Sequence, residues 1–274
     1  MTAKSLICLV LLIFGSIGGA VGQTWTSAEV TLTSATASLE YRQSETDLLA
    51  GEIMGVAYSG FREGQHPDRG AGAKNPSNSE ISEDLNILLN YGFRLLRLYD
   101  SGEYSAAVLQ LIRENDLPLK VLLGSWLDAE VSNHEGCPWL SEPIPAEKLA
   151  SNTRKNVQEI ARSIALANRY PEIVVAVNVG NEALVDWTDH MVSVESVIDY
   201  IRQVKDAVSQ PVTVADNYLW WAEDGQELAR AVDFLGVHTY PQWERKGIDQ
   251  ALGYTVDNIE RVRAAIPDKP IVIL

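Results

Sequence analysis

The chain has 274 residues, of which 46% are hydrophobic and 22% are charged. This composition is ordinary for a globular protein, and it excludes collagen-like, coiled-coil and wholly disordered chains. The length allows one large domain or two small ones, because a domain typically holds roughly 100–200 residues. The formal net charge is -15 at pH 7, so phosphate backbones and anionic membrane surfaces would be repelled. Nucleic acid is therefore not an expected partner.

The N-terminus has the pattern of a secretory signal peptide. Lys4 precedes an apolar run from Leu6 to Phe14, and small residues follow it. Residues 1–22 are predicted to be cleaved, and the chain is predicted to be exported to the periplasm or the extracellular space, where it could associate with the cell envelope. The alternative is an uncleaved membrane anchor, because no charge interrupts residues 5–22. A membrane is an expected partner only in that case.

The next segment, residues 23–50, is rich in Ser, Thr and Ala, and we expect a linker or a loosely packed arm. Residues 51–274 are expected to form one folded domain. Signal cleavage would remove Cys8 and leave Cys137 as the single cysteine, so no internal disulfide is expected. Export without disulfides suits a bacterial periplasm.

From residue 53 onward, short apolar runs alternate with longer amphipathic stretches. The runs are apolar or β-branched throughout, as strands covered on both faces are. Seven strands are predicted, at Ile53–Tyr58, Phe93–Tyr99, Leu119–Gly124, Ile173–Val179, Val212–Ala215, Phe234–His238 and Pro270–Leu274.

Helical signals lie between these strands. Ser77 and Glu80 form a capping box before a helix that carries Ile81 and Leu85. Two more stripes have helical spacing: Val157, Ile160, Ala161, Ile164 and Ala165, and Val197, Tyr200, Ile201, Val204 and Val208. This repeated alternation of strand and helix predicts an α/β protein with a parallel sheet.

Two architectures satisfy this alternation, a doubly wound open sheet and a (β/α)8 TIM barrel. A glycine-rich phosphate loop would favour the open sheet, and none follows a predicted strand. Polar and aromatic residues favour the barrel, because they fall where strands end, at the rim where barrels build active sites. These residues are Tyr58, Tyr99, Trp126, Glu182, Asp216 and Tyr240. We therefore predict a TIM barrel. It is expected to be incomplete and to end in its seventh strand, because a full barrel would need roughly 50–70 residues more.

The strongest chemical signal is the pair Asn181–Glu182 at the end of the fourth predicted strand. A carboxylic acid at the rim can protonate the leaving oxygen of a glycosidic bond, and such an acid is expected to have a raised pKa. The neighbouring amide can hydrogen-bond a sugar hydroxyl. Taken alone, the pair is equally compatible with a solvated polar residue that merely ends a strand.

Aromatic residues strengthen the carbohydrate interpretation. Six tryptophans fall in segments that follow predicted strands, although core packing could account for any one of them: Trp126, Trp139, Trp187, Trp220, Trp221 and Trp243. Sugar rings stack on indole, and their hydroxyls need polar rim groups, for which Asp100, Asp128, Asp216 and Asn217 are candidates.

The sixth predicted strand ends in His238, two residues before Tyr240. Tyr240 could donate a hydrogen bond to a rim carboxylate that His238 orients, or both could simply pack before the turn at Pro241. Arg97 could hold a carboxylate at the barrel mouth or form an ordinary ion pair.

Metal and cysteine chemistry have little support in the sequence. His134, Glu135 and Cys137 are possible ligands, but no second half-site with zinc spacing follows them. Cys137 has no evident histidine partner, and no G-x-S-x-G elbow is present.

Four motifs in chain order resemble successive strand ends of glycoside hydrolase family 17, and the resemblance is closest to its bacterial exported members. The motifs are Gly55–Tyr58, Arg97–Asp100, Val179–Glu182 and Asp233–Pro241, and the segment from Trp126 to Trp139 adds to them. That family comprises β-1,3-glucanases and related glucosyltransferases on a (β/α)8 barrel.

The resemblance implies that Glu182 is the general acid/base and that Asn181 contacts the 2-hydroxyl of the sugar. It also implies that Tyr240 lies beside the nucleophile and that Tyr99 and Asp100 line the −1 region. The nucleophile of the family, a Glu ending the seventh strand, is expected immediately after Leu274, the last residue of the sequence.

The expected activity is therefore retaining hydrolysis of, or transfer from, a β-1,3-glucan, which would be the partner of the chain. No cofactor is implied, because protonation and carboxylate attack need none. The alternative is a non-catalytic glucan-binding remnant or an inactive fragment.

Overall fold

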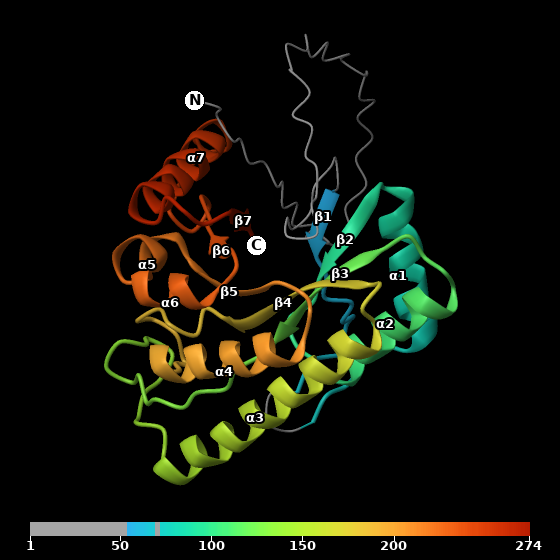
Figure 1. The fold of residues 1–274 in the computed structure, drawn as a ribbon, viewed down its shortest axis with the longest axis horizontal. Coiled ribbons are helices and arrows are strands. Elements are labelled where there is room, and N and C mark those ends of the chain that lie inside the picture. The colour runs from blue at the N-terminus through green and yellow to red at the C-terminus, as the bar shows by residue number, and fades with distance from the viewer. Residues whose placement is uncertain (1–53, 69–71) are drawn as a thin grey trace, which may run out of the picture.

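The computed structural model describes residues 54–68 and 72–274. The predicted signal peptide and the Ser/Thr-rich arm lie outside the described residues. The described chain forms one parallel sheet whose seven strands follow in sequential order, with at least one helix between successive strands (Figure 1). The strands are β1 (Met54–Ala57), β2 (Phe93–Arg97), β3 (Lys120–Ser125), β4 (Val174–Asn181), β5 (Val212–Asn217), β6 (Leu235–His238) and β7 (Ile271–Ile273).

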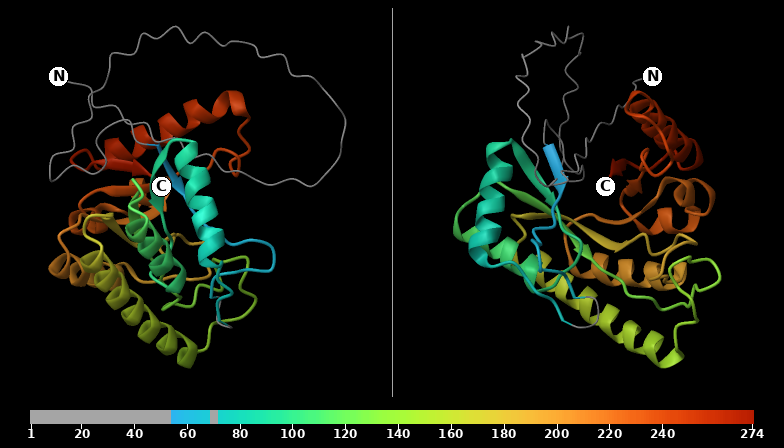
Figure 2. Two further views of the ribbon diagram at one scale, coloured as in Figure 1. Left: turned by 90° about the vertical axis from the view of Figure 1, so that its right-hand side faces the viewer. Right: turned by 180° about the vertical axis from the view of Figure 1, so that it is seen from behind.

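The helices lie along the outer face of this curled sheet (Figures 1 and 2). They are α1 (Asn78–Asn90), α2 (Glu103–Glu114), α3 (Ala146–Arg169), α4 (Val194–Ala207), α5 (Tyr218–Glu223), α6 (Gln226–Ala231) and α7 (Ile248–Ala265). The architecture is an incomplete (β/α)8 TIM barrel, as predicted, and not a doubly wound open sheet. The capping box is also confirmed, since Ser77 caps α1 and Glu80 returns the hydrogen bond.

Two hydrophobic clusters fill the two faces of the sheet. The large one lies between the strands and the helices. A small one lies on the other face, inside the curl, and contains Leu122, Ala176, Phe234 and Val272, one residue each from or beside β3, β4, β6 and β7. Residues paired across neighbouring parallel strands point to the same side, and Leu122 pairs with Arg97 of β2. Arg97 therefore points to the inside of the curl with this second cluster.

Helix α3 differs from its prediction. Val157 is 48% exposed, and the predicted stripe positions Ala161 and Ala165 are also exposed. The side buried against the strands carries Asn152, Asn156 and Glu159 along with Ile160 and Leu166. The predicted stripe is thus confirmed at Ile160 and in part at Ile164, and wrong at its other three positions. The buried side also takes polar residues because they bond the backbone of the loop after β3, which hydropathy alone does not register.

Candidate active site

The ends of β2, β4 and β6 bring Arg97, Asn181–Glu182 and His238 together. Arg97 Nη2 donates to Asn181 Oδ1 at 2.6 Å, and Arg97 Nη1 lies 3.0 Å from His238 Nε2. Strands β2 and β6 are not neighbours in the sheet, so this guanidinium spans the inside of the curl. These residues, 84 and 141 positions from Arg97 in the sequence, meet because parallel strands end at the same rim.

His238 connects the guanidinium to the carboxylate. Its Nδ1 lies 2.7 Å from Glu182 Oε1. A guanidinium has no acceptor, so His238 Nε2 must accept from Arg97, and Nδ1 must carry the proton that it donates to Glu182. Burial lowers the pKa of His238, opposed by its bond to Glu182 and assisted by the charge of Arg97. The neutral, Nδ1-protonated ring satisfies all of these contacts.

The pKa of Glu182 is lowered, contrary to the raised value expected of a general acid. Burial by itself raises this pKa, but the hydrogen bond from His238 and the electrostatic effects of His238, Arg97 and His190 outweigh it. The surroundings of Glu182 in this structure are therefore those of a carboxylate that stays ionised near neutral pH. A second carboxylate placed beside it would shift the pKa upward again.

Two tyrosines line the same rim. The Arg97 guanidinium lies 4.7 Å from the centroid of the Tyr99 ring, and the His238 and Tyr240 rings are 5.4 Å apart. Burial and the nearby Glu182 charge raise the pKa of Tyr240, so its hydroxyl remains a hydrogen-bond donor. In the part of the chain that the structure describes, this hydroxyl has no hydrogen-bond partner, so it is free to donate to an incoming group.

Trp126 enters the rim from the end of β3. It stacks on His190 with the ring centroids 4.6 Å apart. Its backbone N–H donates to Glu159 Oε1 at 3.2 Å, and the N–H of Asp128 donates to Asn156 Oδ1 at 2.8 Å. The buried polar side of α3 thus fixes the course of the loop that presents this indole.

Three of the predicted substrate-binding residues use polar atoms in hydrogen bonds to other parts of the protein. Tyr58 is buried and its hydroxyl donates to Asp84 of α1, so the side chain faces the helical layer. Asp100 accepts from the N–H of Gly102 and the hydroxyl of Ser105, at the start of α2. Tyr58 faces the helices because side chains alternate along a strand: Ala57 pairs with inward-facing Arg97, so the next residue, Tyr58, points outward.

Asp216 is the third of these residues and is completely buried. Its Oδ1 accepts from the N–H of Asn217 at 2.7 Å and its Oδ2 from the N–H of Leu184 at 3.1 Å. Burial raises the pKa of Asp216 to about 8, with a further contribution from the Glu182 charge and against the effect of the two N–H donors. A sugar hydroxyl in solvent has no access to this carboxyl.

The other tryptophans divide between core and surface. Trp221 is fully buried and donates from Nε1 to the carbonyl of Gly236, so it is a core residue. Trp139, Trp187 and Trp243 are 75%, 40% and 84% exposed. Trp220 is half-buried and packs edge-on against Trp221 with the ring centroids 5.4 Å apart. Trp126 is the predicted indole that stacks on a residue bonded to Asn181, namely His190.

Sequence reasoning missed His190, nine residues after Asn181. Its Nε2 lies 2.8 Å from the carbonyl oxygen of Asn181, and its Nδ1 lies 2.8 Å from Asp189 Oδ1 and 2.9 Å from Thr188 Oγ1. An isolated histidine in a loop has no spacing pattern that could have revealed it. Thr188 and His190 reach the site only because the loop after β4 folds back on that strand.

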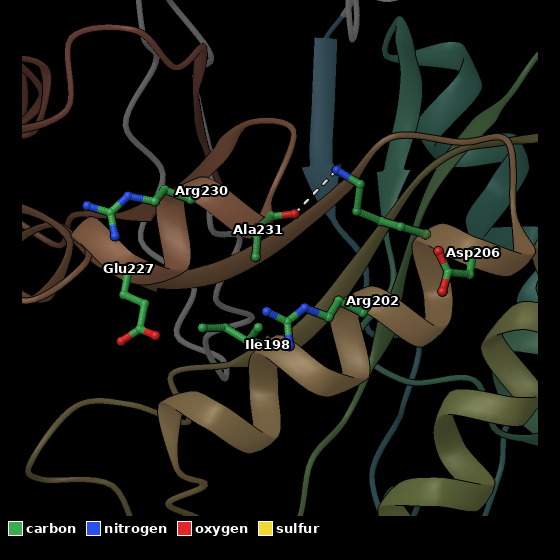
Figure 3. Close-up of a pocket in the computed structure, with 7 residues that line it drawn as sticks. Ile198, Arg202, Asp206, Glu227, Arg230 and Ala231 are labelled. Carbon is green, nitrogen blue, oxygen red and sulfur yellow. Dashed lines mark hydrogen bonds between the residues drawn. The ribbon is translucent and has the colours of Figure 1, made fainter.

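A pocket of about 430 Å³ lies elsewhere, between α4 and α6 on the helical layer (Figure 3). Its lining is mostly charged and includes Arg202, Lys205, Glu227 and Arg230. None of the strand-end residues described above lines it. Within the described ranges, no cluster of three or more His, Cys, Asp or Glu side chains is arranged to hold a metal ion. The same part of the chain contains no helix with the length and apolarity to cross a membrane.

The fold was compared with solved structures. An endo-laminarinase from Formosa Hel1_33_131 superposes with a TM-score of 0.65 and 26% identity, over 81% of this chain and 65% of the other. The chain thus spans less than two thirds of the length of that enzyme. An active-site mutant of Rhizomucor miehei β-1,3-glucanosyltransferase, in complex with laminaritriose, superposes with a TM-score of 0.58 and 22% identity, over 81% of this chain and 70% of the other. A GH2 β-galacturonidase from Eisenbergiella tayi superposes with a TM-score of 0.60 and 15% identity, over 85% of this chain and 38% of the other. At this identity the two chains share the fold alone.

At the level of sequence, no curated protein matches the chain. A family model does match, over residues 55–274, which includes every strand end described above. This chain belongs to the family of the BtgE/BtgC glycoside hydrolase domain.

Proposed function

We propose that the chain is a retaining glycosidase of the family 17 type that acts on β-1,3-glucan, with Glu182 as the general acid/base. One observation carries the proposal: the two oxygens of the Glu182 carboxylate have different surroundings. Oε1 is held by His238, whereas Oε2 has no hydrogen-bond partner among the residues that the structure describes. The side chain is 25% exposed. One oxygen is therefore fixed, and the other is free to exchange a proton with a glycosidic oxygen.

The substrate class is supported by the structural neighbours, which are an endo-laminarinase and β-1,3-glucanosyltransferases, one of them described as family 17. Asn181 fits the role of binding the 2-hydroxyl of the sugar. Its Oδ1 is occupied by Arg97, so the amide orientation is fixed and its NH2 group is left to donate. Trp126 supplies a stacking surface, and the unpartnered hydroxyl of Tyr240 is a further donor.

The proposed reaction is a double displacement. Glu182 gives its proton to the glycosidic oxygen as the bond from that oxygen to the anomeric carbon breaks, and a second carboxylate bonds to the anomeric carbon. Glu182 then takes a proton from water or from a sugar hydroxyl, whose oxygen displaces the carboxylate. The resemblance puts the second carboxylate immediately after Leu274.

The lowered pKa of Glu182 fits this sequence of steps. In the first step the ionised second carboxylate would stand beside Glu182 and raise its pKa, which favours the acid form. Once that carboxylate is esterified by the sugar, its charge is gone. The surroundings supplied by His238 and Arg97 then lower the pKa of Glu182 and favour the base form.

The test is release of reducing sugar from laminarin by the full-length protein. We expect release by the wild type, its loss in Glu182→Gln, and its retention in Glu223→Gln, a matched change in an exposed ion pair with Arg261. The anomeric configuration of the first product, followed by NMR, is expected to be β. Binding of laminarin without release would favour the non-catalytic alternative, and an α product would contradict the retaining mechanism.

A further inference from the structure

The backbone that carries Glu182 has an unfavourable conformation. Gly180 has a φ of +91°, which glycine adopts readily, but Glu182 itself has a φ of +49°. For a residue with a Cβ this left-handed conformation costs free energy, and it persists only where the surroundings impose it. The N–H of Glu182 donates to the carbonyl of Ala215 at 2.8 Å. The carbonyl of Ala183 accepts from the N–H of Val192 at 2.9 Å, so backbone bonds hold one group on each side of the Glu182 Cα.

Two side chains bond the remaining atoms of the same two peptide groups, Asn181–Glu182 and Ala183–Leu184. Before Glu182, the carbonyl of Asn181 accepts a hydrogen bond from His190 Nε2 at 2.8 Å. A carbonyl can only accept, so Nε2 carries a proton, while Nδ1 faces both Asp189 Oδ1 and Thr188 Oγ1. After Glu182, the N–H of Leu184 donates to Asp216 Oδ2.

Asp216 lies buried directly beside this turn. Its carboxyl has no exposed surface, and burial of a carboxyl is costly unless hydrogen bonds compensate it. Both of its bonds go to backbone N–H groups at the ends of β4 and β5, one of them two residues beyond Glu182. His190 is also shared, because its ring stacks on Trp126 while its Nε2 holds Asn181.

We propose that Asp216 and His190 are positioning residues that hold the strained Asn181–Glu182 turn from its two sides and so aim the Glu182 carboxylate at the glycosidic oxygen. Through the stack on Trp126, His190 also sets the distance between that carboxylate and the aromatic surface for the sugar. This inference rests on the proposed function, since aiming has a catalytic consequence only if Glu182 is the acid/base.

The activity test compares kcat and KM on laminarin for the full-length protein and its variants. Misplacement of a catalytic group by about 1 Å can cost about 100-fold in rate, and we expect a loss of kcat of that order in Asp216→Ala and in His190→Ala. Asp216→Asn keeps one acceptor oxygen, and His190→Gln keeps a donor of similar reach, so both should retain most of kcat. KM should change little in Asp216→Ala, because Asp216 does not touch the sugar.

Asp233→Ala is the matched control. Asp233 also accepts a backbone N–H from β5, that of Val212, but at the opposite end of the strand. The substitution Asp233→Ala should leave kcat unchanged. In the double variant of Asp216 and His190, we expect the second substitution to cost less than it does alone, because the two residues hold the same turn.

A readout that does not depend on activity is the titration of the Glu182 carboxyl by ¹³C NMR. Release of the turn should move Glu182 away from His238 and Arg97 and raise its pKa in both alanine variants, whereas Asp233→Ala should not change it. An unchanged Glu182 titration in folded His190→Ala and Asp216→Ala, with a lower melting temperature only, would overturn the positioning role. If the wild type releases no sugar but the pKa of Glu182 still rises in the two alanine variants, the proposed function is contradicted and the hold on the turn remains supported.

Discussion

The raised pKa of Asp216 predicts how the free energy of unfolding depends on pH. Its pKa is 3.8 as an ordinary carboxyl and about 8 in the folded protein, because burial disfavours the charged form. Between these two values the folded state binds a proton that the unfolded state has released. Stability attributable to Asp216 is therefore fully present below pH 3.8, falls as the pH rises, and levels off above about pH 8.

The magnitude follows from the linkage between pKa and free energy. Each pH unit inside this window costs about 1.4 kcal/mol for one proton, so the free energy of unfolding should fall by about 2.7 kcal/mol between pH 5 and pH 7 on account of Asp216 alone. Asp216→Asn cannot ionise, and it should lack this component while sharing the titration of all other groups. The difference between the two pH profiles isolates the carboxyl.

The assay is urea unfolding of the wild type and Asp216→Asn at pH 5, 6 and 7, followed by tryptophan fluorescence. We expect the wild type to lose about 2.7 kcal/mol more than the variant over this range. Direct ¹³C titration of the Asp216 carboxyl should give a midpoint near pH 8. Parallel profiles for the two proteins, or a midpoint near 4, would show that the two backbone N–H donors outweigh burial and would refute the reasoning.

Three further predictions concern other parts of the molecule. His238→Ala removes the donor that lowers the pKa of Glu182, so the alkaline limb of the kcat/KM pH profile, where protonated Glu182 is lost, should move to higher pH; an unmoved limb would contradict the assigned hydrogen bond from His238. Asn156→Ala leaves the backbone N–H and carbonyl of Asp128, in the loop after Trp126, without their partner. We expect the free energy of unfolding in urea to fall by about 1–3 kcal/mol and KM for laminarin to rise. An unchanged KM would show that α3 does not influence substrate binding. Trp221→Ala should cost about 3–5 kcal/mol of stability, measured by thermal unfolding, because it empties a fully buried site, and a loss below 1 kcal/mol would argue against its core placement.

The site was predictable where chemistry is linked to strand ends. Glu182, Asn181 and His238 end apolar runs, and parallel strands bring their ends to one rim, so these residues could be grouped without coordinates. Arg97 was visible as a candidate, but its role as the bridge between β4 and β6 depends on the curl of the sheet, which local sequence does not specify.

Tyr58 and Tyr99 show why the rest of the site could not be predicted. Both follow a strand closely, yet Tyr99 lies under Arg97 whereas Tyr58 bonds α1 on the opposite side of the sheet. Side chains alternate with a period of two, so an uncertainty of one residue in where a strand ends reverses the side on which a side chain lies. Predicted strand ends carry an uncertainty of that size.

Periodicity and neighbours along the chain were enough to predict the alternation of strands and helices, the parallel order of the strands, and the position of an acid at a strand end. Three features became visible in the folded arrangement alone: the complete burial of Asp216, the polar buried side of α3, and the hydrogen bond from His190 to the carbonyl of Asn181. Each of these depends on hydrogen bonds between segments far apart in the chain or on burial by several elements at once, and a local pattern of residues contains neither.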